Sequence, residues 1–314
     1  MAKHAFEKFI NKPLAGAKKK EVLRQEKKKR KKEAREKYEA KKSRPQFISK
    51  QKITIEKKQP KILKNQDENV MPLNKFIAHA GICSRREAAD FVKGGKVMVN
   101  DKTVTEPGFK VTAADKITYD GKKIFLQKNL VYILINKPKD YITTTDDPQG
   151  RKTILDLIKG ATTERVYPVG RLDRNTTGVL LLTNDGELSQ KLTHPSFEIK
   201  KIYEVKLDKP LSKKDMEAIV TGITLEDGFI KADSIAYADA NDKSIIGIEI
   251  HSGRNRIVRR IFEQLGYIVK NLDRVMFANL TKKNVDRGRW RFLQEKEVRL
   301  LKYMNNSFVR NKRN

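Results

Sequence analysis

A carboxylate between two arginines is the feature of this sequence that could most readily do chemistry. Asp173 stands between Arg171 and Arg174, and Gly170 and Gly178 bracket the segment. Glycine permits the tight backbone path that a loop leading into a buried strand needs. A charged carboxylate at such a place is one that folding alone would disfavour. Taken by itself, the segment fits a structural turn with an Asp–Arg pair as well as it fits a catalytic site.

Apolar runs on both sides of this loop predict the strands of a sheet. Residues 179–182 are entirely aliphatic, and the turn sequence Asn-Asp-Gly follows at 184–186. Residues 131–135 form a second apolar run, suited to the interior of a sheet, which stops at Asn136-Lys137-Pro138. The loop that carries Asp173 is therefore expected to lead into a buried strand.

Further periodic segments complete the predicted fold. Residues 200–207 alternate with period two, which places Tyr203 on one face with Lys201, Val205 and Leu207. Residues 254–265 predict a basic helix with the buried stripe Ile257, Val258, Ile261 and Leu265. Other helices are predicted over 187–192 and 212–219, and strands over 230–237 and 245–250. Helices alternating with strands and hairpins indicate an α+β fold with a mixed, mainly antiparallel sheet.

A small module precedes these segments. Apolar residues at helical spacing predict one helix over 73–80, and a capping box at Ser84 predicts a second over 85–93. Residues 96–104 and 117–126 alternate like two β-hairpins. The sequence therefore predicts a helix pair packed on short strands.

The charge balance points to an anionic partner. The 314 residues include 69 Lys and Arg against 39 Asp and Glu, a net charge of +30. Nucleic acid is the first candidate and an anionic membrane surface the second. No apolar run approaches the length of a spanning helix and no signal peptide is evident, so a soluble cytoplasmic protein is expected. Cys83 is the only cysteine, which excludes disulfides within one chain, and we expect it to be buried.

Half of the excess charge lies in residues 1–70, which contain 24 Lys or Arg and 9 Asp or Glu. This extension has almost no apolar face, so we expect it to be disordered or a single charged helix. It is either a solubilising or targeting tail or an RNA-binding arm that orders on phosphate. Residues 305–314 are expected to form a frayed basic tail.

The motifs taken together resemble one family. Residues 170–178, Gly-Arg-Leu-Asp-Arg-Asn-Thr-Thr-Gly, resemble the catalytic signature of RNA pseudouridine synthases of the RsuA/RluB branch, which modify ribosomal RNA. The motifs at 136–138, 201–203 and 253–260 follow in the family's order. The resemblance covers about residues 71–300. It implies an S4 RNA-binding domain over 71–128 and a catalytic domain over 129–304.

The resemblance also implies roles for single residues. Asp173 is the family's essential aspartate, which either attacks C1′ of the target uridine or removes a sugar proton to give a glycal. Tyr203 matches the aromatic residue that stacks on the uracil. Arg259 matches the basic residue that pairs with the aspartate, and such pairing favours the ionised carboxylate. RNA contacts in the catalytic domain are implied for Arg171, Arg174, Lys201, Arg254, Asn255, Arg256 and Arg260.

In the S4-like module the resemblance implies a phosphate-binding face made of Lys75, Arg85, Arg86 and Lys96. Residue types alone would favour a solvated charged face on a structural helix pair. The chain also departs from the family at one position, because many relatives have Gln or Glu where this chain has Ile257. A polar contact is therefore expected to be missing there.

The expected reaction breaks the C1′–N1 glycosidic bond of a uridine, rotates the uracil and rejoins it through C5. It has no redox step and no group carrier, so neither a cofactor nor a metal is expected, and the sequence has no G-x-G-x-x-G, Walker loop or metal-ligand cluster. We predict site-specific formation of pseudouridine in ribosomal RNA, more in keeping with the large subunit, by a monomer acting on ribosomal RNA or a ribosome-assembly intermediate.

The alternative is a non-catalytic RNA-binding or ribosome-assembly factor that retains the fold. The joint presence of Asp173, Tyr203 and Arg259 argues against it, because a protein that only binds RNA has no need for all three. A DNA-binding protein of the same charge is a third interpretation, but the sequence has no recognisable groove-reading helix.

Overall fold

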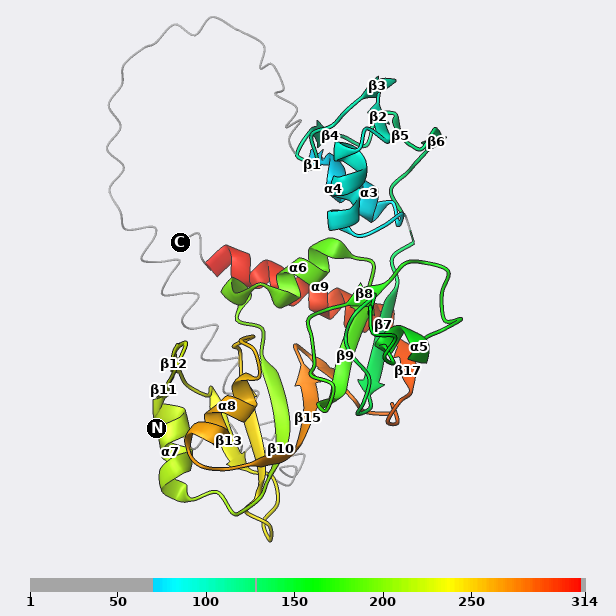
Figure 1. The fold of residues 1–314 in the computed structure, drawn as a ribbon. Coiled ribbons are helices and arrows are strands. Elements are labelled where there is room, and N and C mark those ends of the chain that lie inside the picture. Colours follow the sequence, from blue (N-terminus) through cyan, green and yellow to red (C-terminus); the bar gives the residue numbers. More distant parts are fainter. Residues whose placement is uncertain (1–69, 128, 312–314) are drawn as a thin grey trace, which may run out of the picture. The chain divides into compact units, whose positions relative to one another are not determined.

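The structure is a computed structural model that describes residues 70–127 and 129–311, with side chains described through residue 303. Apart from Val70, the extension expected over residues 1–70 lies outside the described residues. The first described elements form the S4-like module (Figure 1). They are β1 (Met71–Pro72), α3 (Leu73–His79), α4 (Arg85–Lys93), β2 (Val97–Val99), β3 (Lys102–Thr103), β4 (Lys110–Val111), β5 (Ile117–Tyr119) and β6 (Lys122–Lys123).

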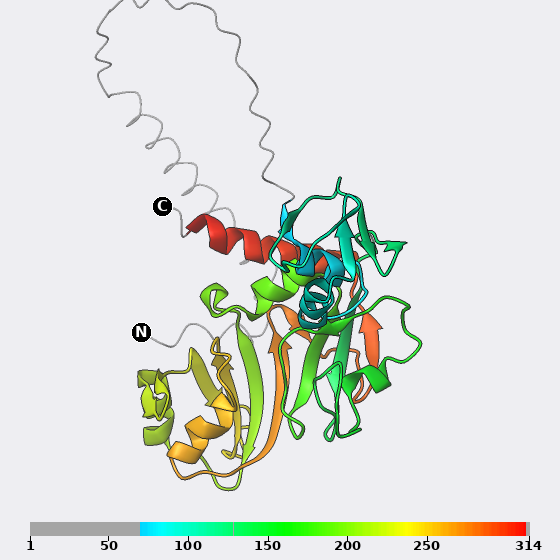
Figure 2. The ribbon, with the colours of Figure 1, turned by 45° about the horizontal axis from the view of Figure 1, so that its top comes forward.

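Local sequence signals shape this module. The Ser84 hydroxyl accepts a hydrogen bond from the Glu87 amide at 3.3 Å, and the Glu87 carboxylate accepts one from the Ser84 amide at 2.7 Å. This is the predicted capping box of α4. Left-handed residues at 100–101 and 120–121 make the two tight hairpin turns. Helices α3 and α4 pack side by side (Figures 1 and 2), and Cys83 is buried in the core that they share with the strands.

The rest of the described chain is built on one nine-stranded sheet. Its main order is β13-β14-β10-β15-β9-β7-β17, with β16 on β15 and β8 on β9. Every pairing is antiparallel except that of β15 with β9, so the expected mixed, mainly antiparallel sheet is confirmed. The strands are β7 (Tyr132–Lys137), β8 (Tyr167–Pro168), β9 (Thr177–Thr183), β10 (Lys201–Leu207), β13 (Ser234–Tyr237), β14 (Ile245–Ile250), β15 (Val269–Phe277), β16 (Leu280–Thr281) and β17 (Trp290–Phe292).

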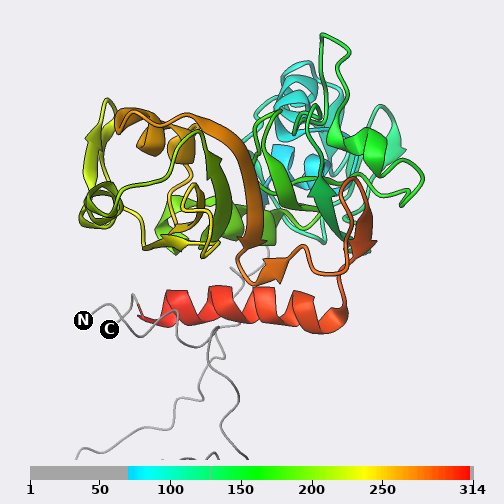
Figure 3. The same cartoon turned by 90° about the horizontal axis from the view of Figure 1, so that it is seen from below.

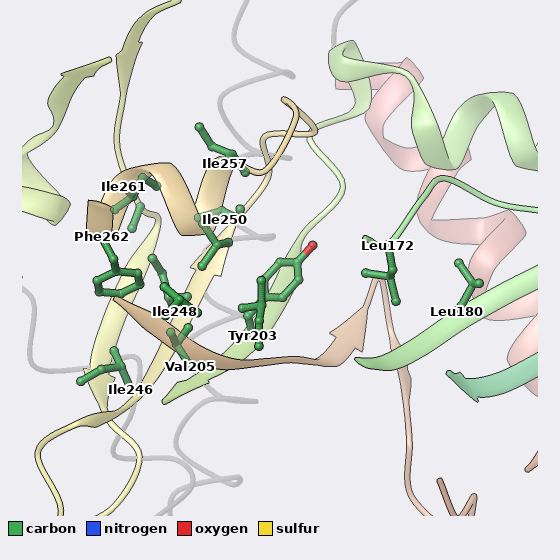
Figure 4. Packing of buried hydrophobic residues seen from close by; sticks show 14 of the residues in the cluster. Leu172, Leu180, Tyr203, Val205, Ile246, Ile248, Ile250, Ile257, Ile261 and Phe262 are labelled. Atoms are coloured by element: carbon green, nitrogen blue, oxygen red, sulfur yellow. The ribbon is translucent and has the colours of Figure 1, made fainter. Parts of the chain in front are cut away.

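Helices cover both faces of this sheet. On one face, Ile257 and Ile261 of α8 (Ile257–Gln264) pack with the isoleucines of β14, and α7 (Lys213–Thr221) lies beside β13 (Figure 4). On the other face lie α6 (Gly186–Thr193) and α9 (Glu295–Asn311), and Figure 3 shows α9 running along that side. Strands β7 and β9 are buried on both faces, which explains their continuous apolar runs.

The shorter elements are α5 (Ile154–Leu157), the 3-10 turn η1 (Pro195–Phe197) and the hairpin of β11 (Ile223–Leu225) with β12 (Gly228–Ile230). This hairpin corrects the strand predicted over 230–237. Strand β12 pairs back on β11, whereas β13 begins at Ser234 and pairs with β14. The predicted strand is therefore two strands that belong to different sheets.

The helix predicted over 254–265 begins later than expected. Arg256 has φ +46°, in the left-handed region, so α8 starts only at Ile257. The buried stripe also contains Phe262, whereas Leu265 lies beyond the last helical residue and is partly buried. The shortened helix leaves residues 253–256 as a loop in front of α8.

The sequence pattern predicts neither β15 nor α9. Strand β15 carries Lys270, Asp273 and Arg274, so it shows neither a clean alternation nor an apolar run. Helix α9 continues to Asn311, so most of the segment expected as a frayed tail over 305–314 is helical.

A glycine allows the parallel pairing of β9 with β15. Gly178 has φ +110°, and a Cβ built on it would lie 2.2 Å from the carbonyl oxygen of Arg274 and 2.6 Å from its amide nitrogen. The pairing consists of Thr177 with Asp273 and Gly178 with Arg274. A side chain at position 178 would therefore push apart the two halves of the sheet, β13-β14-β10-β15 and β9-β7-β17.

We predict that Gly178→Ala lowers the free energy of unfolding by about 2–5 kcal/mol, because it adds a backbone clash to left-handed strain. Gly228→Ala is the matched control, since Gly228 has φ +109° and no atom within 4 Å of its ideal Cβ. Its loss should be confined to strain, about 1–3 kcal/mol. Denaturant unfolding of both variants measures the difference. Losses of equal size would show that the contact with Arg274 does not restrict residue 178.

Candidate active site

Several residues of the candidate site lie on neighbouring strands and are paired with one another in register across the sheet. Lys137 of β7 pairs with Gly178 of β9, Gly178 pairs with Arg274 of β15, and Arg274 pairs with Tyr203 of β10. Directly paired residues project to the same face of a sheet. The loop with Asp173 enters β9 next to this row, so the row and the loop approach each other.

A cavity of about 590 Å³ lies at this place, with Arg274 and Tyr203 among its lining residues. Three loops supply most of the remaining wall. They are the loop before β9 (170–174 and 176), the loop in front of α8 (252–256) and the segment that follows β7 (142–144, 146–147 and 151). Both halves of the sheet therefore contribute to one cavity.

Asp173, in the wall of this cavity, faces two arginines. Its Oδ2 atom lies 3.8 Å from Nη1 of Arg256 and 3.9 Å from Nε of Arg259. The Arg259 side chain is buried, and its Nη1 donates a hydrogen bond to the Val269 carbonyl at 3.0 Å. Burial and Arg256 lower the pKa of Arg259, while Asp173 raises it. The sequence implied only Arg259 as the partner of Asp173, and the left-handed backbone at Arg256 brings the second cation.

The loop that carries Asp173 is held by a buried lysine. Lys137 is fully buried, and its Nζ donates to the backbone carbonyls of Pro138, Asp173, Arg174 and Thr176 at 2.9–3.1 Å. Burial lowers the pKa of Lys137 to about 8, against the opposing effect of Asp173. The sequence motif contained Lys137 without giving it a role. The feature of the sequence that could have indicated its role is a lysine at the end of a largely apolar strand.

Thr143 holds the same loop from the other side. Its hydroxyl donates to the Leu172 carbonyl at 3.0 Å and accepts from the Leu172 amide at 3.3 Å. A loop that lacks regular backbone pairing needs such side-chain partners for its polar groups. The position of Asp173 is therefore set by side chains from the β7 end of the sheet.

Tyr203 is buried in the cluster between β10 and α8. Figure 4 shows its ring beside Ile248 and Val205, with the hydroxyl directed out of that cluster on the side of Leu172. Lys201, two residues earlier on β10, lines the cavity, but its Nζ donates to the carbonyls of Ile199 and His251 at 3.0 and 2.7 Å. Burial lowers the pKa of Lys201 to about 8.

The other basic residues expected to contact RNA divide into two groups. Arg171 is exposed and lines the cavity, and no other described residue bonds to its guanidinium. Arg174 forms an exposed ion pair with Asp140 at 3.2 Å. Arg254 and Arg260 instead hold the β11–β12 turn, since both bind the carboxylate of Asp227. Asn255 lines the cavity, whereas Arg260 does not.

Ile257, the departure from the family pattern, is buried in the cluster that contains Tyr203. In the S4-like module, Arg85 and Arg86 are exposed in the first turn of α4 and Lys96 is exposed before β2. Lys75 on α3 is partly buried. Each of the four is thus at least partly open to solvent.

No group of three or more His, Cys, Asp or Glu side chains is placed to hold a metal ion in the part of the chain that the structure describes. Among the described helices, none combines the length and apolarity that crossing a membrane requires.

Comparison with known proteins agrees with this geometry. A family model for RNA pseudouridylate synthase matches residues 131–264, and an S4 domain model matches residues 71–117. The chain is 43% identical over 233 residues to the ribosomal large subunit pseudouridine synthase B of Bacillus subtilis (strain 168). The aligned region covers 73% of this chain and 95% of that protein. It is 39% identical over 245 residues to an uncharacterized RNA pseudouridine synthase of Aquifex aeolicus (strain VF5), covering 77% and 98%.

A solved crystal structure of a pseudouridylate synthase has the same fold, with a TM-score of 0.54 and 26% identity, covering 74% of this chain and 99% of that chain. The family model spans the loop with Asp173, Tyr203 on β10 and the start of helix α8, which all line the cavity, whereas β15 lies beyond the match. The chain therefore belongs to the RNA pseudouridine synthases, isomerases of uridine in RNA, with an S4 domain preceding the synthase domain.

Proposed function

We propose that this enzyme converts a specific uridine of large-subunit ribosomal RNA to pseudouridine, with Asp173 as the essential carboxylate. The observation that carries the proposal is the carboxylate of Asp173 in the cavity, within 4 Å of two arginines. The name of the Bacillus subtilis relative supports the large subunit as the source of the substrate. The proposed enzyme acts in the cytoplasm as a monomer on ribosomal RNA or an assembly intermediate, without a small-molecule cofactor.

Asp173 would act on the sugar of an extruded uridine. It either attacks C1′ as the C1′–N1 bond breaks, or removes a sugar proton so that a glycal forms. After the uracil has turned, the C1′–C5 bond forms as the Asp173–C1′ bond breaks or, on the glycal route, as the abstracted sugar proton returns. C5 then loses its proton and N1 gains one, so the product is an isomer of the substrate. Arg256 and Arg259 would orient the carboxylate, because opposite charges at this distance attract each other.

Tyr203 would hold the extruded base by stacking, a contact worth about 1–3 kcal/mol per base. Its hydroxyl, which is directed out of the buried cluster, would relay the proton that leaves C5. Arg171, whose guanidinium is exposed at the cavity, would bind a flanking phosphate. Exposed cations of the S4 domain, Arg85, Arg86 and Lys96, would add phosphate contacts that position the RNA without reading its sequence.

Lys137 would act as a positioning residue. By donating to the backbone carbonyls of Asp173 and Arg174, it fixes the backbone that carries the carboxylate. A displacement of about 1 Å in a catalytic group costs about a hundredfold in rate. The lysine would therefore raise the turnover rate without touching RNA.

We predict that Asp173→Asn lowers isomerisation by about a thousandfold or more, while RNA affinity stays near that of the wild type, because the amide keeps the size of the side chain. Tritium release from 5-tritiated uridine in ribosomal RNA transcripts measures the rate. Asp286→Asn is the matched control, since Asp286 is exposed and outside the cavity lining. Equal activity of the two variants would remove Asp173 from the mechanism.

We expect Lys137→Met to lower kcat by about tenfold to a hundredfold with little change in KM, because the loop loses its fixed position. Lys139→Met is the control two residues away, since Lys139 is exposed and, within the described part of the chain, its Nζ donates only to Asn271. Single-turnover rates and RNA binding separate the two parameters. A raised KM with unchanged kcat would mean that Lys137 serves binding instead.

The pKa of Lys137, lowered to about 8, gives a separate test of its burial. An unfolded lysine titrates near pH ~10.4, so between about pH 8 and ~10.4 the unfolded chain binds a proton that the native state has lost. The wild type should therefore gain stability relative to Lys137→Met as pH rises through this window, by at most about 1.4 kcal/mol per pH unit. Urea unfolding of both proteins at pH ~7.5 and ~9.5 measures the gain. A constant or shrinking difference would contradict the lowered pKa.

A further inference from the structure

Buried polar atoms without partners lie in the wall of the catalytic cavity. Arg274 and Thr176 are each 2% exposed, and both line the cavity. Among the described residues, neither Nη2 of Arg274 nor Oγ1 of Thr176 has a hydrogen-bond partner. Because buried polar groups are nearly always hydrogen-bonded, these two atoms call for a ligand that supplies the missing partner.

These two residues lie next to the joint at Gly178. Arg274 is opposite Gly178 in register, Thr176 is the residue immediately before β9, and both line the cavity. The backbone of each is fixed. Arg274 is packed against the Gly178 Cα, and the Thr176 carbonyl accepts a hydrogen bond from Lys137 at 2.9 Å. The unpartnered atoms are therefore held in place before any ligand arrives.

The rest of the Arg274 guanidinium contacts a backbone carbonyl and an aromatic ring, and no carboxylate among the described residues. Its Nε donates to the Val179 carbonyl at 2.8 Å, and its Cζ lies 4.6 Å from the centre of the Phe277 ring. Burial lowers the pKa of Arg274, against the opposing effect of the Tyr203 hydroxyl beside it. No carboxylate among the described residues forms an ion pair with Arg274. A buried cation without a carboxylate costs stability, so it is a poor structural device.

The adjacent residue on β15 shows the contrast. Asp273 forms ion pairs with Arg287 and Lys282 and accepts a hydrogen bond from the Thr177 hydroxyl. Burial raises the pKa of Asp273, but these partners outweigh burial and hold it at about 2. The one carboxylate next to Arg274 in sequence is thus already satisfied by other cations.

We propose that Arg274 and Thr176 form the subsite that recognises the polar edge of the extruded uracil, with Arg274 Nη2 donating to a carbonyl oxygen of the base. The inference deepens the proposed function, because it rests on a base stacked at Tyr203, the register neighbour of Arg274. A guanidinium has donors only, so its partner must be an acceptor, whereas a hydroxyl can accept from an N–H. The edge O2, N3–H, O4 of uracil offers both in one plane.

The same subsite fits the base before and after it turns. Rotation of uracil by half a turn about the N3–C6 axis exchanges N1 with C5 and O2 with O4, while N3–H stays in place. A donor at either carbonyl and a hydroxyl at N3 therefore meet identical partners in substrate and product. The subsite would therefore retain the detached uracil and bind its two orientations equally well. Cytosine places an amino group where uracil has O4, which sets a donor against a donor.

The test combines protein variants with base analogues. Ribosomal RNA carrying 2-thiouridine or 4-thiouridine at the target position weakens one carbonyl acceptor at a time. We expect one of the two analogues to slow single-turnover isomerisation by the wild type about tenfold, the size of one lost hydrogen bond. In Arg274→Met the same analogue should cause less than about a twofold further loss, because the donor is already absent.

Arg291→Met is the matched control. Nη1 and Nη2 of Arg291 both donate to the Glu297 carboxylate, and Arg291 does not line the cavity. This variant should keep the full analogue effect of the wild type. Unfolding midpoints distinguish this role from a structural one, because an arginine that only stabilised the fold would lower the midpoint when removed. Arg274→Met should be no less stable than Arg291→Met, because it removes a buried cation that has no acid partner.

Thr176→Val keeps the shape of the side chain and tests the subsite if the methionine variant does not fold. Its kcat/KM should fall about fivefold with an unchanged or raised unfolding midpoint, because only an unpartnered hydroxyl is lost. The proposal is overturned if neither analogue slows the wild type, if the analogue effect is equal in wild type and Arg274→Met, or if Thr176→Val is fully active. Unmodified large- and small-subunit transcripts, assayed alongside, test the proposed function separately.

Discussion

The parallel pairing of β9 with β15 is the contact on which the site depends, because it joins two halves of the sheet that each carry part of the chemistry. One half brings Asp173 on its loop, and the other brings Tyr203 and the two arginines. The pairing spans only two residues on each strand, so the absence of a Cβ at Gly178 decides whether the strands can meet. The buried carboxylate of Asp273 holds the joint, because its partners come from β9 and from the segment after β16.

The second constraint is the irregular path of the loop that carries Asp173. Its backbone carbonyls cannot all pair within a sheet, and Lys137 satisfies several of them at once with one buried amine. Burial lowers the pKa of this lysine, but without it several backbone carbonyls beside Asp173 would lack a hydrogen-bond partner. Lys137, at the end of β7, therefore fixes the backbone at Asp173, and it is also the residue that pairs with Gly178.

Net charge gives only a coarse view of how this protein meets RNA. Several cations of the catalytic domain are occupied within the fold: Arg254 and Arg260 hold the β11–β12 turn, and Lys201 is bonded to backbone carbonyls. Arg171 at the cavity is available to a phosphate. The basic residues thus serve two tasks in the fold, which are building it and flanking the carboxylate, and a third that we propose, which is contacting RNA. Only their partners in the folded chain distinguish these tasks.

The sequence by itself determined the elements whose signals are local. The apolar runs of β7 and β9, the alternation of β10 and the capping box of α4 follow from burial on two faces, burial on one face and helix-end hydrogen bonding. Family motifs pointed to Asp173, Tyr203 and Arg259 together. Only the tertiary structure decided what depends on contacts distant in sequence: the β15 strand hidden by its charges, the second arginine beside Asp173, and the carbonyls bound by Lys137. Such contacts leave no periodic pattern, because each joins residues that lie far apart in the sequence.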